Sequence, residues 1–509
     1  MKKSRSIVAL SMLLILTGCG GEKESQNGKD TGGSQYTGPK KTIIIDGGGD
    51  VGDFTTTKSM NASALNPYPY NTLETLCNEW TKLHPEYEVQ ILKTSSHGDR
   101  TVLVPQLEQK TAPDITYQSG TVINSDLGKN YYVNMTSYLA KPNPYLEGNQ
   151  KWSDIYNEAE LATTQASDGD YYSISLERIP VGLMVNKTML NNAGITILPT
   201  TYKQFIDDID ILKGKLSSNQ EAYSTTYMWY NIALESNVFS YLLEDGDVLR
   251  KNGKIDTEEL ARLYKKKLWQ PDLNISGDNP TYEDNRYYDY LKLCAELGKR
   301  KASKSFDAVS NFSSGNLAFL EATGKEMRNI AAKKDKMEFD WEIIPYPDLT
   351  TESYAHASAP CVRGSAGLAT SWFITNSAES KGTVDGCVDL LMYLTAPNQN
   401  NRLIGDLKGG MPLNPASDFK LADHLVNLNK AYWEDIDKMK TGERVAWGAL
   451  CSWEVLGYAY NTAYIRNMED VEGGAKTVEV AATALGNTIA STIKNKMVTE
   501  GWDESSWDL

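Results

Sequence analysis

Two aspartates flank a run of three glycines early in the chain. Asp46 follows the apolar stretch Ile43–Ile45, and Asp50 comes directly after Gly47–Gly49. The apolar stretch predicts a short buried strand, and the glycines would let the backbone approach a ligand closely. Two carboxylates at such a loop could accept hydrogen bonds from a ligand. The same pair also occurs in ordinary turns, where it needs no function.

A second pair of polar side chains, Tyr117 and Gln118, follows the segment Ala112–Ile115. That segment predicts a strand, and open α/β sheets bind their ligands at the carboxyl ends of the strands. We therefore expect Tyr117 and Gln118 to lie near a ligand.

The aromatic composition favours a sugar as that ligand. The chain has 29 Tyr and 11 Trp but 9 Phe. A sugar offers hydroxyls, which polar side chains bind, and a flat C–H face, which Trp and Tyr rings can cover. Covering one face buries about 50 Å² of apolar surface and contributes about 1 kcal/mol. The alternative is that tyrosine is simply tolerated at protein surfaces.

Alternating strand and helix patterns are expected to position these residues. Residues 87–91 alternate between apolar and polar types, which predicts a half-buried strand. Amphipathic helices are predicted through residues 384–394 and 478–493. Two pairs resemble capping boxes at helix starts, Asn71 with Glu74 and Thr201 with Gln204. This order favours an α/β architecture with largely parallel sheets.

The bulk composition excludes several kinds of partner. A chain of 509 residues is expected to form more than one domain. Its formal net charge of −15 opposes general binding to nucleic acid or to an anionic membrane surface. The cysteines that follow Cys19 are scattered and odd in number, so we expect buried free thiols. The four histidines are equally dispersed, and we expect no metal site and no cofactor.

The N-terminal segment has the pattern of a signal peptide. Residues 1–18 contain a basic start and an apolar run too short to span a bilayer. The run ends in Leu16–Cys19, which resembles a bacterial lipobox. In proteins with that motif the cysteine carries lipid, so Cys19 is expected to anchor the protein outside the cytoplasm, at the cell membrane. Residues 19–41 would then be the lipidated cysteine and a flexible tether, because almost none of them is apolar.

Sequence motifs of common enzyme classes are missing. The chain has no Gly-x-Ser-x-Gly, no His-Glu-x-x-His, no Gly-Lys-Ser/Thr phosphate loop and no Gly-x-Gly-x-x-Gly after a strand. We therefore expect no catalytic residues. A glycosidase could still hold its two carboxylates far apart in the sequence.

Several segments, read in order, resemble the family of extracellular solute-binding proteins that includes maltose-binding protein. The segments are His84–Val89, Ala112–Ile115, Tyr132–Leu139, Asp168–Ile174, Met184–Lys187, Ala193–Tyr202, Phe312–Phe319 and Ile344–Pro347. Each is weak alone, but their shared order is hard to obtain by chance. The loop Tyr117–Gly120 lacks the aromatic and charged groups that some maltose binders have there, which argues against maltose itself.

The resemblance implies a two-lobed, periplasmic-binding-protein-like α/β fold, with a hinge of crossing strands and a ligand cleft between the lobes. The N-terminal lobe would comprise residues 42–174 plus 363–410. The C-terminal lobe would comprise residues 175–362 plus 411–509. The three crossings are expected at 173–178, 362–372 and 409–414.

The resemblance also adds candidate ligand residues. Trp229, Trp447 and Trp453 lie where relatives place stacking aromatics, and Trp372 lies beside the second crossing; core packing is the alternative for each. Glu177 and Arg178, at the first crossing, could contact ligand or form a hinge salt bridge. The complete predicted set is Asp46, Asp50, Tyr117, Gln118, Glu177, Arg178, Trp229, Trp372, Trp447 and Trp453.

The function implied by the resemblance is capture of a carbohydrate, expected to be an oligosaccharide, and its delivery to the permease subunits of an ABC importer. The receptor is expected to be a monomer. The alternatives that remain open are a receptor for a polyamine, a peptide or a metal chelate, a sugar-sensing partner of a membrane kinase, and a glycan-active enzyme. Asp46, Asp50 and Glu177 keep the polyamine alternative open, because polyamines call for carboxylates.

Overall fold

The computed structural model describes most of the chain from residue 36 onward. Residues Pro39–Leu509 form one compact unit. The described residues are 36–50, 52–64, 66–94, 96–162, 164–166, 168–226, 229–238, 257–265, 286–303, 305–355, 357, 363–414, 420–438 and 453–507.

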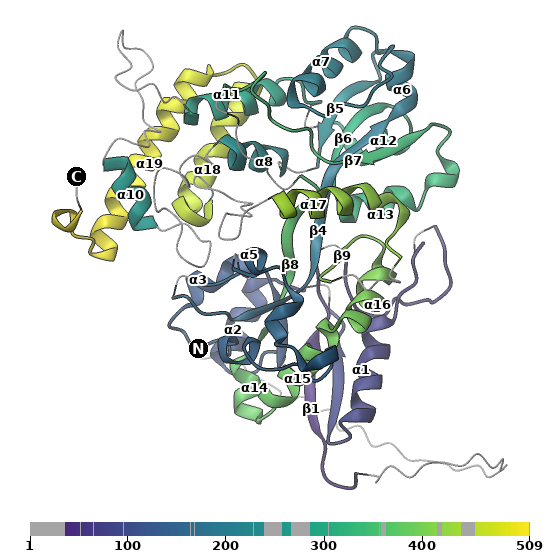
Figure 1. Ribbon diagram of the computed structural model, residues 1–509, viewed down its shortest axis with the longest axis vertical. Helices are drawn as coiled ribbons and strands as arrows, with labels where there is room; N and C mark the ends of the chain where they lie inside the picture. The colour runs from purple at the N-terminus through teal and green to yellow at the C-terminus, as the bar shows by residue number, and fades with distance from the viewer. Residues whose placement is uncertain are drawn as a thin grey trace, which may run out of the picture. The chain divides into compact units, whose positions relative to one another are not determined.

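A nine-stranded sheet runs through this unit (Figure 1). Its main path has the order β2-β1-β3-β8-β4-β6-β5, and β7 and β9 both pair with β4. The strands are β1 (Lys41–Asp46), β2 (Tyr87–Leu92), β3 (Ile115–Gln118), β4 (Ser173–Asn186), β5 (Glu221–Thr225), β6 (Leu317–Thr323), β7 (Trp341–Ile344), β8 (Ser365–Ile374) and β9 (Met411–Pro412). The strands predicted at 43–45 and 87–91 are confirmed as parts of β1 and β2.

The sheet is less parallel than the sequence predicted. β1 pairs in parallel with β2 and β3, and β5 with β6. By contrast, β6, β7, β8 and β9 all run antiparallel to β4, and β3 runs antiparallel to β8. The long strands β4 and β8 explain the difference, because they pair in opposite directions from Ser173↔Phe373 to Pro180↔Ser365. A chain that passes both ways between two groups of strands cannot keep every strand parallel.

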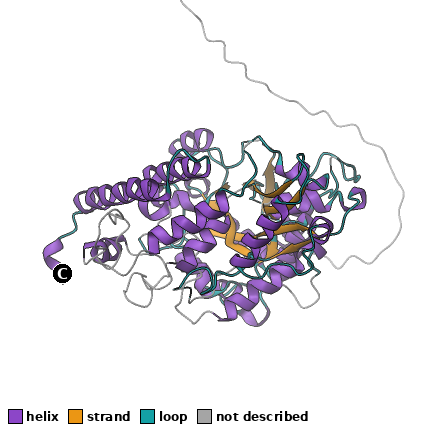
Figure 2. Cartoon of the chain, turned by 90° about the horizontal axis from the view of Figure 1, so that it is seen from above, coloured by secondary structure: helices purple, strands orange, loops and turns teal. Residues whose placement is uncertain are grey.

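Helices surround the strands (Figure 2). They are α1 (Thr72–Leu83), α2 (Arg100–Glu108), α3 (Ile123–Asp126), α4 (Thr136–Leu139), α5 (Glu158–Ala162), α6 (Lys187–Asn192), α7 (Tyr202–Lys213), α8 (Trp229–Val238), α10 (Thr257–Lys265), α11 (Arg286–Gly298), α12 (Ala308–Ser313), α13 (Gly324–Ala331), α14 (Asn376–Lys381), α15 (Val384–Thr395), α16 (Pro397–Leu407), α17 (Val426–Lys438), α18 (Trp453–Glu472) and α19 (Val478–Glu500). The helices predicted through 384–394 and 478–493 are confirmed as α15 and α19. None of the described helices combines the length and the apolar character needed to cross a membrane.

One of the two predicted capping boxes forms. At α7 the Thr201 hydroxyl accepts from the Gln204 backbone N–H, and the Gln204 side-chain oxygen accepts from the Thr201 N–H, both at 3.3 Å. At α1 the prediction was wrong, because Asn71 makes no capping hydrogen bond with its side chain. Glu74 accepts instead from the Thr56 hydroxyl. A local motif does not show that a residue from a neighbouring loop, here Thr56, will bind the glutamate instead.

The buried hydrophobic side chains of the described residues form four clusters, of which two are much larger than the others. One of these two cores contains Trp80 and Leu390 and is built around β1, α1, α15 and α16. The other contains Phe205 and Leu485 and is built around β5, β6, α7, α11 and α19. The first half of β4 contributes to the first core and the second half to the second. In Figure 1, β4 and β8 extend side by side from one group of strands to the other.

Three of the scattered cysteines are described, and the prediction of buried free thiols holds for them. Cys77, Cys294 and Cys387 are buried and unbridged. Burial raises the pKa of the Cys77 thiol to about 12, so it stays protonated at neutral pH. Cys361 and Cys451 lie outside the described residues.

Candidate functional site

The first two predicted pairs come together at one edge of the sheet. β1 and β3 are parallel neighbours, with Ile45 opposite Ile115, so their carboxyl ends meet. Asp50, in the loop after β1, therefore reaches the end of β3. The Tyr117 hydroxyl donates to Asp50 Oδ1 at 2.5 Å. Burial, followed by the charge of Asp50, raises the pKa of Tyr117, so the phenol remains a donor.

Thr370 joins this pair to Glu177. Its backbone N–H donates to Asp50 Oδ2 at 2.5 Å, and its hydroxyl donates to Glu177 Oε1. The Asp50 N–H donates back to the Thr370 hydroxyl oxygen at 3.2 Å. Thr370 has a φ of +52°, a left-handed conformation that is unfavourable for a β-branched residue. Such strain persists where surrounding bonds impose it, and here they connect β8 to the glycine loop and to β4.

A histidine fixes the glycine loop from the other side. His97 Nδ1 bonds to the Asp46 carboxylate, and Nε2 lies 3.2 Å from Asp53 Oδ2. The carboxylates of Asp46 and then Asp53 raise the pKa of His97 to about 9, so the ring is an imidazolium at neutral pH. Gly48 is required at this point, because a Cβ there would lie 2.6 Å from His97 Cβ and 2.8 Å from Tyr117 Cδ1. The Asp46 carboxylate is thus paired with His97 within the protein.

Glu177 and Arg178 do not pair with each other. They are neighbours on β4, so their side chains leave opposite faces of the strand. Arg178 Nε donates to both Glu160 oxygens, at 3.0 and 2.9 Å, and Nη1 donates to the Pro412 carbonyl at 2.5 Å. The rings of Tyr432 and Trp433 lie 4.8 and 5.0 Å from the Arg178 guanidinium carbon. Arg178 is therefore buried in a salt bridge with Glu160, which corresponds to the hinge salt bridge that the sequence left open as the alternative to ligand contact.

Two other predicted residues are also buried. Trp372 has no exposed surface and packs edge-on against Phe54, with ring centroids 5.8 Å apart. Its ring lies in the core, which is the alternative that the sequence left open. The Gln118 amide donates to the Tyr117 carbonyl at 2.7 Å, and its oxygen accepts from Arg100 Nη1 at 3.4 Å. Gln118 thus supports the end of β3.

The remaining tryptophans are only partly described. Trp229 begins α8, directly beyond the carboxyl end of β5, and is partly buried against the second core. Trp453 begins α18, but its side chain lies outside the described residues, as does all of Trp447. Both stay predictions.

Arg328, in α13, belongs to the same neighbourhood and was not predicted. β6 runs parallel to β5, and α13 begins directly after β6, so Arg328 lies near the same sheet edge as Trp229. Its guanidinium is 5.7 Å from the Tyr68 ring centroid, and its Nη1 would be 2.6 Å from a Cβ on Gly52. It forms no hydrogen bond or ion pair with any described residue, and its Nε is buried.

Arg328 is partly buried, where a charged group without hydrogen-bond acceptors is unfavourable. Burial lowers the pKa of the guanidinium, and the negative charges nearby, including Glu177, only partly offset this. A guanidinium has five N–H donors and remains charged in proteins. Arg328 lies in the last turn of α13, and no local sequence pattern singles it out.

Together these side chains can bind a ligand rich in hydroxyls. Asp50 and Glu177 supply oxygen acceptors, Arg328 supplies unused donors, and Tyr68 and Trp229 supply aromatic rings. The acceptors come from the part of the sheet near the first core, and Arg328 comes from α13, whose buried residues Met327 and Ile330 pack in a smaller cluster with residues of β6 and β7.

Comparison with known proteins identifies the family. Residues 75–440 match the model of the bacterial extracellular solute-binding proteins. None of the curated proteins matches the chain.

Solved structures with the same fold cover nearly the whole chain. The sugar-binding protein MalE from Xanthomonas citri matches with a TM-score of 0.58 and 15% identity, over 91% of this chain and 100% of its own. The GacH receptor of Streptomyces glaucescens, which was solved unliganded and with acarbose, matches with a TM-score of 0.56 and 14% identity, over 90% of this chain and 99% of its own. The RafE protein of Streptococcus pneumoniae matches with a TM-score of 0.55 and 14% identity, over 90% of this chain and 100% of its own. The expected periplasmic-binding-protein-like α/β fold is thereby confirmed.

Proposed function

Because the chain belongs to the bacterial extracellular solute-binding protein family, whose members are receptors and not enzymes, we propose that it captures a carbohydrate and delivers it to the permease subunits of an ABC importer. The proposed site comprises Asp50, Tyr117, Glu177, Trp229 and Arg328. The sugar-binding proteins among its structural relatives support a sugar as the solute. At identities near 15%, they do not carry the ligand over by themselves.

The observation that carries this proposal is Arg328. Its guanidinium has no acceptor among the described residues, and it lies beside the loop that bears Asp50. A ligand hydroxyl or other oxygen bound between Arg328 and Asp50 would join α13 to the glycine loop. Closure around a ligand is the usual response of two-lobed receptors.

The hinge of this closure would consist of β4, β8 and β9. β9 pairs with Glu177 and Arg178 of β4, and β8 pairs with β4 along most of its length. The proposed lobes are residues 42–174 plus 363–410 and residues 175–362 plus 411–509. Lobes connected by hydrogen-bonded strands can rotate by small changes in a few backbone angles.

Attachment to the membrane is part of the same proposal. Cys19 and most of the tether lie outside the described residues, so the anchor rests on the lipobox Leu16–Cys19 alone. A diacylated cysteine would hold the receptor near its importer, because two acyl chains give stable anchoring.

A polyamine is a weaker candidate than a sugar. Its ammonium groups would need free carboxylates, but Asp46 is paired with His97 and the Arg328 cation lies close to Glu177. A like charge at that position would repel a polyamine.

A ligand screen by thermal unfolding tests the proposal. Mono- and oligosaccharides would be compared with peptides and polyamines. A ligand at one hundred times its dissociation constant adds about 2.7 kcal/mol to the free energy of unfolding, which shifts the melting temperature measurably. We expect a shift with at least one saccharide. A shift with a peptide or polyamine alone would overturn the carbohydrate assignment.

A matched pair of variants then tests the site. Arg328→Gln should reduce the saccharide-dependent shift at the same ligand concentration by half or more. Arg402→Gln should keep it, because Arg402 forms an exposed ion pair with Glu79, with Nη1 2.8 Å from Oε2. Equal shifts in both variants would contradict the assignment of Arg328.

A further inference from the structure

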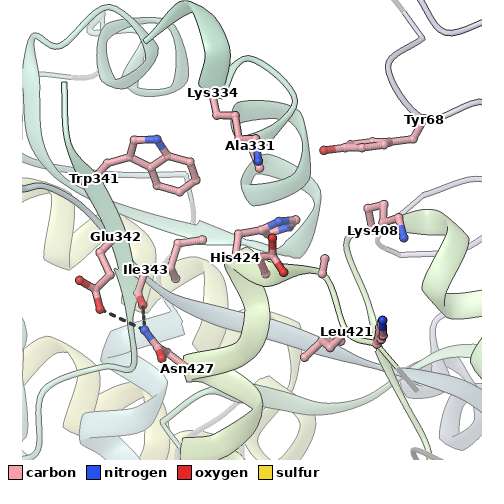
Figure 3. A pocket seen from close by; sticks show the side chains of 13 residues that line it. Tyr68, Ala331, Lys334, Trp341, Glu342, Ile343, Lys408, Leu421, His424 and Asn427 are labelled. Carbon is pink, nitrogen blue, oxygen red and sulfur yellow. Dashed lines mark hydrogen bonds between the residues drawn. The ribbon is translucent and has the colours of Figure 1, made fainter. Parts of the chain in front are cut away.

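A cavity of about 530 Å³ opens beside the candidate site (Figure 3). This volume lies in the range of small-molecule pockets. Its walls come from distant parts of the sequence: the segment before α1, the end of α13, β7, the end of α16 and the short helix at Asp423–Leu425. Tyr68 belongs both to this cavity and to the surroundings of Arg328, so the cavity adjoins the candidate site.

The cavity walls carry an excess of positive charge. Lys334, Lys408 and Lys420 all line it, and none of them forms an ion pair with a carboxylate in the described part of the chain. Of the two acidic residues in the lining, Glu342 is already engaged by Asn427, at 3.1 Å, and by Lys187, at 3.5 Å. Asp423 is left to balance three ammonium groups.

His424 adds a neutral polar group to the same wall. Its Nε2 is buried and has no hydrogen-bond partner in the described structure. Burial lowers the pKa of His424 to about 4, and the charges of Lys334 and Lys408 act in the same direction. The ring is therefore uncharged at neutral pH and can donate or accept one hydrogen bond.

Two aromatic rings complete the cavity. Trp341, from β7, and Tyr68 lie on opposite sides of it in Figure 3. Both are partly exposed. Ala331 lines the cavity and lies three residues after Arg328 on one face of α13, so the same helix serves both the cavity and the candidate site.

We propose that this cavity binds an acidic saccharide unit, a sugar ring that carries a carboxylate or a sulfate group, between Lys334, Lys408 and Lys420. The ring would lie against Trp341 or Tyr68, and the anionic group would accept charge-assisted hydrogen bonds from the lysines. This inference rests on the proposed carbohydrate function and narrows it, since a neutral sugar would leave the lysines unused.

Calorimetric titration of the purified protein with two matched pairs of probes tests the inference. Digalacturonate is compared with its dimethyl ester, and lactose sulfate with lactose. We expect at least one acidic probe to bind at least tenfold more tightly than its uncharged partner. The pair that shows the difference identifies the anionic group. The affinity of the acidic probe should fall as sodium chloride is raised from 50 to 500 mM, because salt screens exposed charges.

Two triple variants with the same change in net charge separate the cavity from general electrostatics. Changing Lys334, Lys408 and Lys420 to Gln should weaken the acidic probe at least tenfold and leave the neutral probe within threefold. Changing the exposed residues Lys333, Lys336 and Lys494 to Gln should alter neither probe by more than twofold.

Other results of these titrations would contradict either the acidic-saccharide inference or the carbohydrate function. Equal binding of acidic and neutral probes, or equal losses in the two triple variants, would refute the acidic-saccharide inference and leave the carbohydrate function standing. Inorganic sulfate that binds as tightly as lactose sulfate would reduce the cavity to a simple anion site. If none of these probes and no saccharide of the thermal screen binds, the carbohydrate function itself fails.

Discussion

Arg178 is fully buried and Arg328 is only partly exposed, yet the two side chains have different surroundings. Arg178 donates two hydrogen bonds to Glu160 and a third to the Pro412 carbonyl, and its guanidinium also contacts two aromatic rings. Arg328 meets one tyrosine ring and finds no acceptor among the described residues. Burying a charge without a partner costs free energy, so such a group is retained where a ligand supplies the acceptor.

The comparison separates two uses of the same residue type. Arg178 connects β4 to α5, β9 and α17, and its Nε and Nη1 both donate to acceptors within the fold, while its buried Nη2 has no hydrogen-bond partner in the described part of the chain. Arg328 projects from α13 toward Gly52, beside Asp50. Removing the first should therefore change stability, and removing the second should change binding.

The largest expected effect is on stability, in Arg178→Met. Because Glu160 would remain buried without its cation, the free energy of unfolding should fall by about 3–5 kcal/mol. Urea unfolding measures this loss. The double variant Arg178→Met with Glu160→Gln should recover much of it, because no unpaired charge then remains. A loss below about 1 kcal/mol in the single variant would show that Arg178 does not stabilise the fold.

The next effect is on binding, in Arg328→Gln. Losing charge-assisted hydrogen bonds should weaken saccharide binding by about 1.5–3 kcal/mol, roughly ten- to a hundredfold. The free energy of unfolding should stay the same or increase, because an unpaired charge is removed. Calorimetry measures the saccharide affinity, and urea unfolding of the same sample measures the stability. A large loss of stability with unchanged affinity would reverse the roles of the two arginines.

The third effect concerns His97, whose pKa rises from about 6.5 in an unfolded chain to about 9 in the fold. A raised pKa stabilises the fold fully below pH 6.5, and that contribution is lost as the pH rises through 9. The loss should be about 1–3 kcal/mol between pH 6 and 10, measured by urea unfolding. His97→Gln should lack this part of the pH dependence. An unchanged pH profile in the variant would show that the Asp46 pair does not stabilise the loop.

The smallest effect is expected at the surface, in Arg402→Gln. Arg402 and Glu79 are exposed, and such ion pairs contribute at most about 1 kcal/mol. Thermal unfolding should show a small change, and saccharide affinity should not change. A larger loss of stability or affinity in Arg402→Gln would mean that removing any arginine damages this protein. The effects at Arg178 and Arg328 would then not be specific to those sites.

Local sequence was enough to single out Asp50 and Tyr117 as candidate ligand residues, although their hydrogen bond with each other was not predicted. Both follow apolar strands, and the carboxyl ends of parallel neighbours meet at one edge. It was not enough for Arg178, whose partner Glu160 lies on a different element and belongs to no local motif. Nor could it show that Trp372 is buried, because an aromatic near a crossing strand can face the core or the ligand.

Arg328 shows the opposite difficulty. Its local sequence predicts an ordinary amphipathic helix, and α13 is one. The unusual feature is the absence of an acceptor around the side chain, which appears only when Gly52, Tyr68 and Glu177 are placed around it. Long-range packing, which no spacing rule encodes, decides whether a charged residue is paired.

Hydrogen–deuterium exchange with and without the saccharide found in the thermal screen tests the central claim most directly. If the ligand joins Asp50 to Arg328, amide exchange should slow in the loop 47–54 and in α13 together. Slower exchange in only one of these segments, or in neither while the ligand is bound, would contradict a site shared between them.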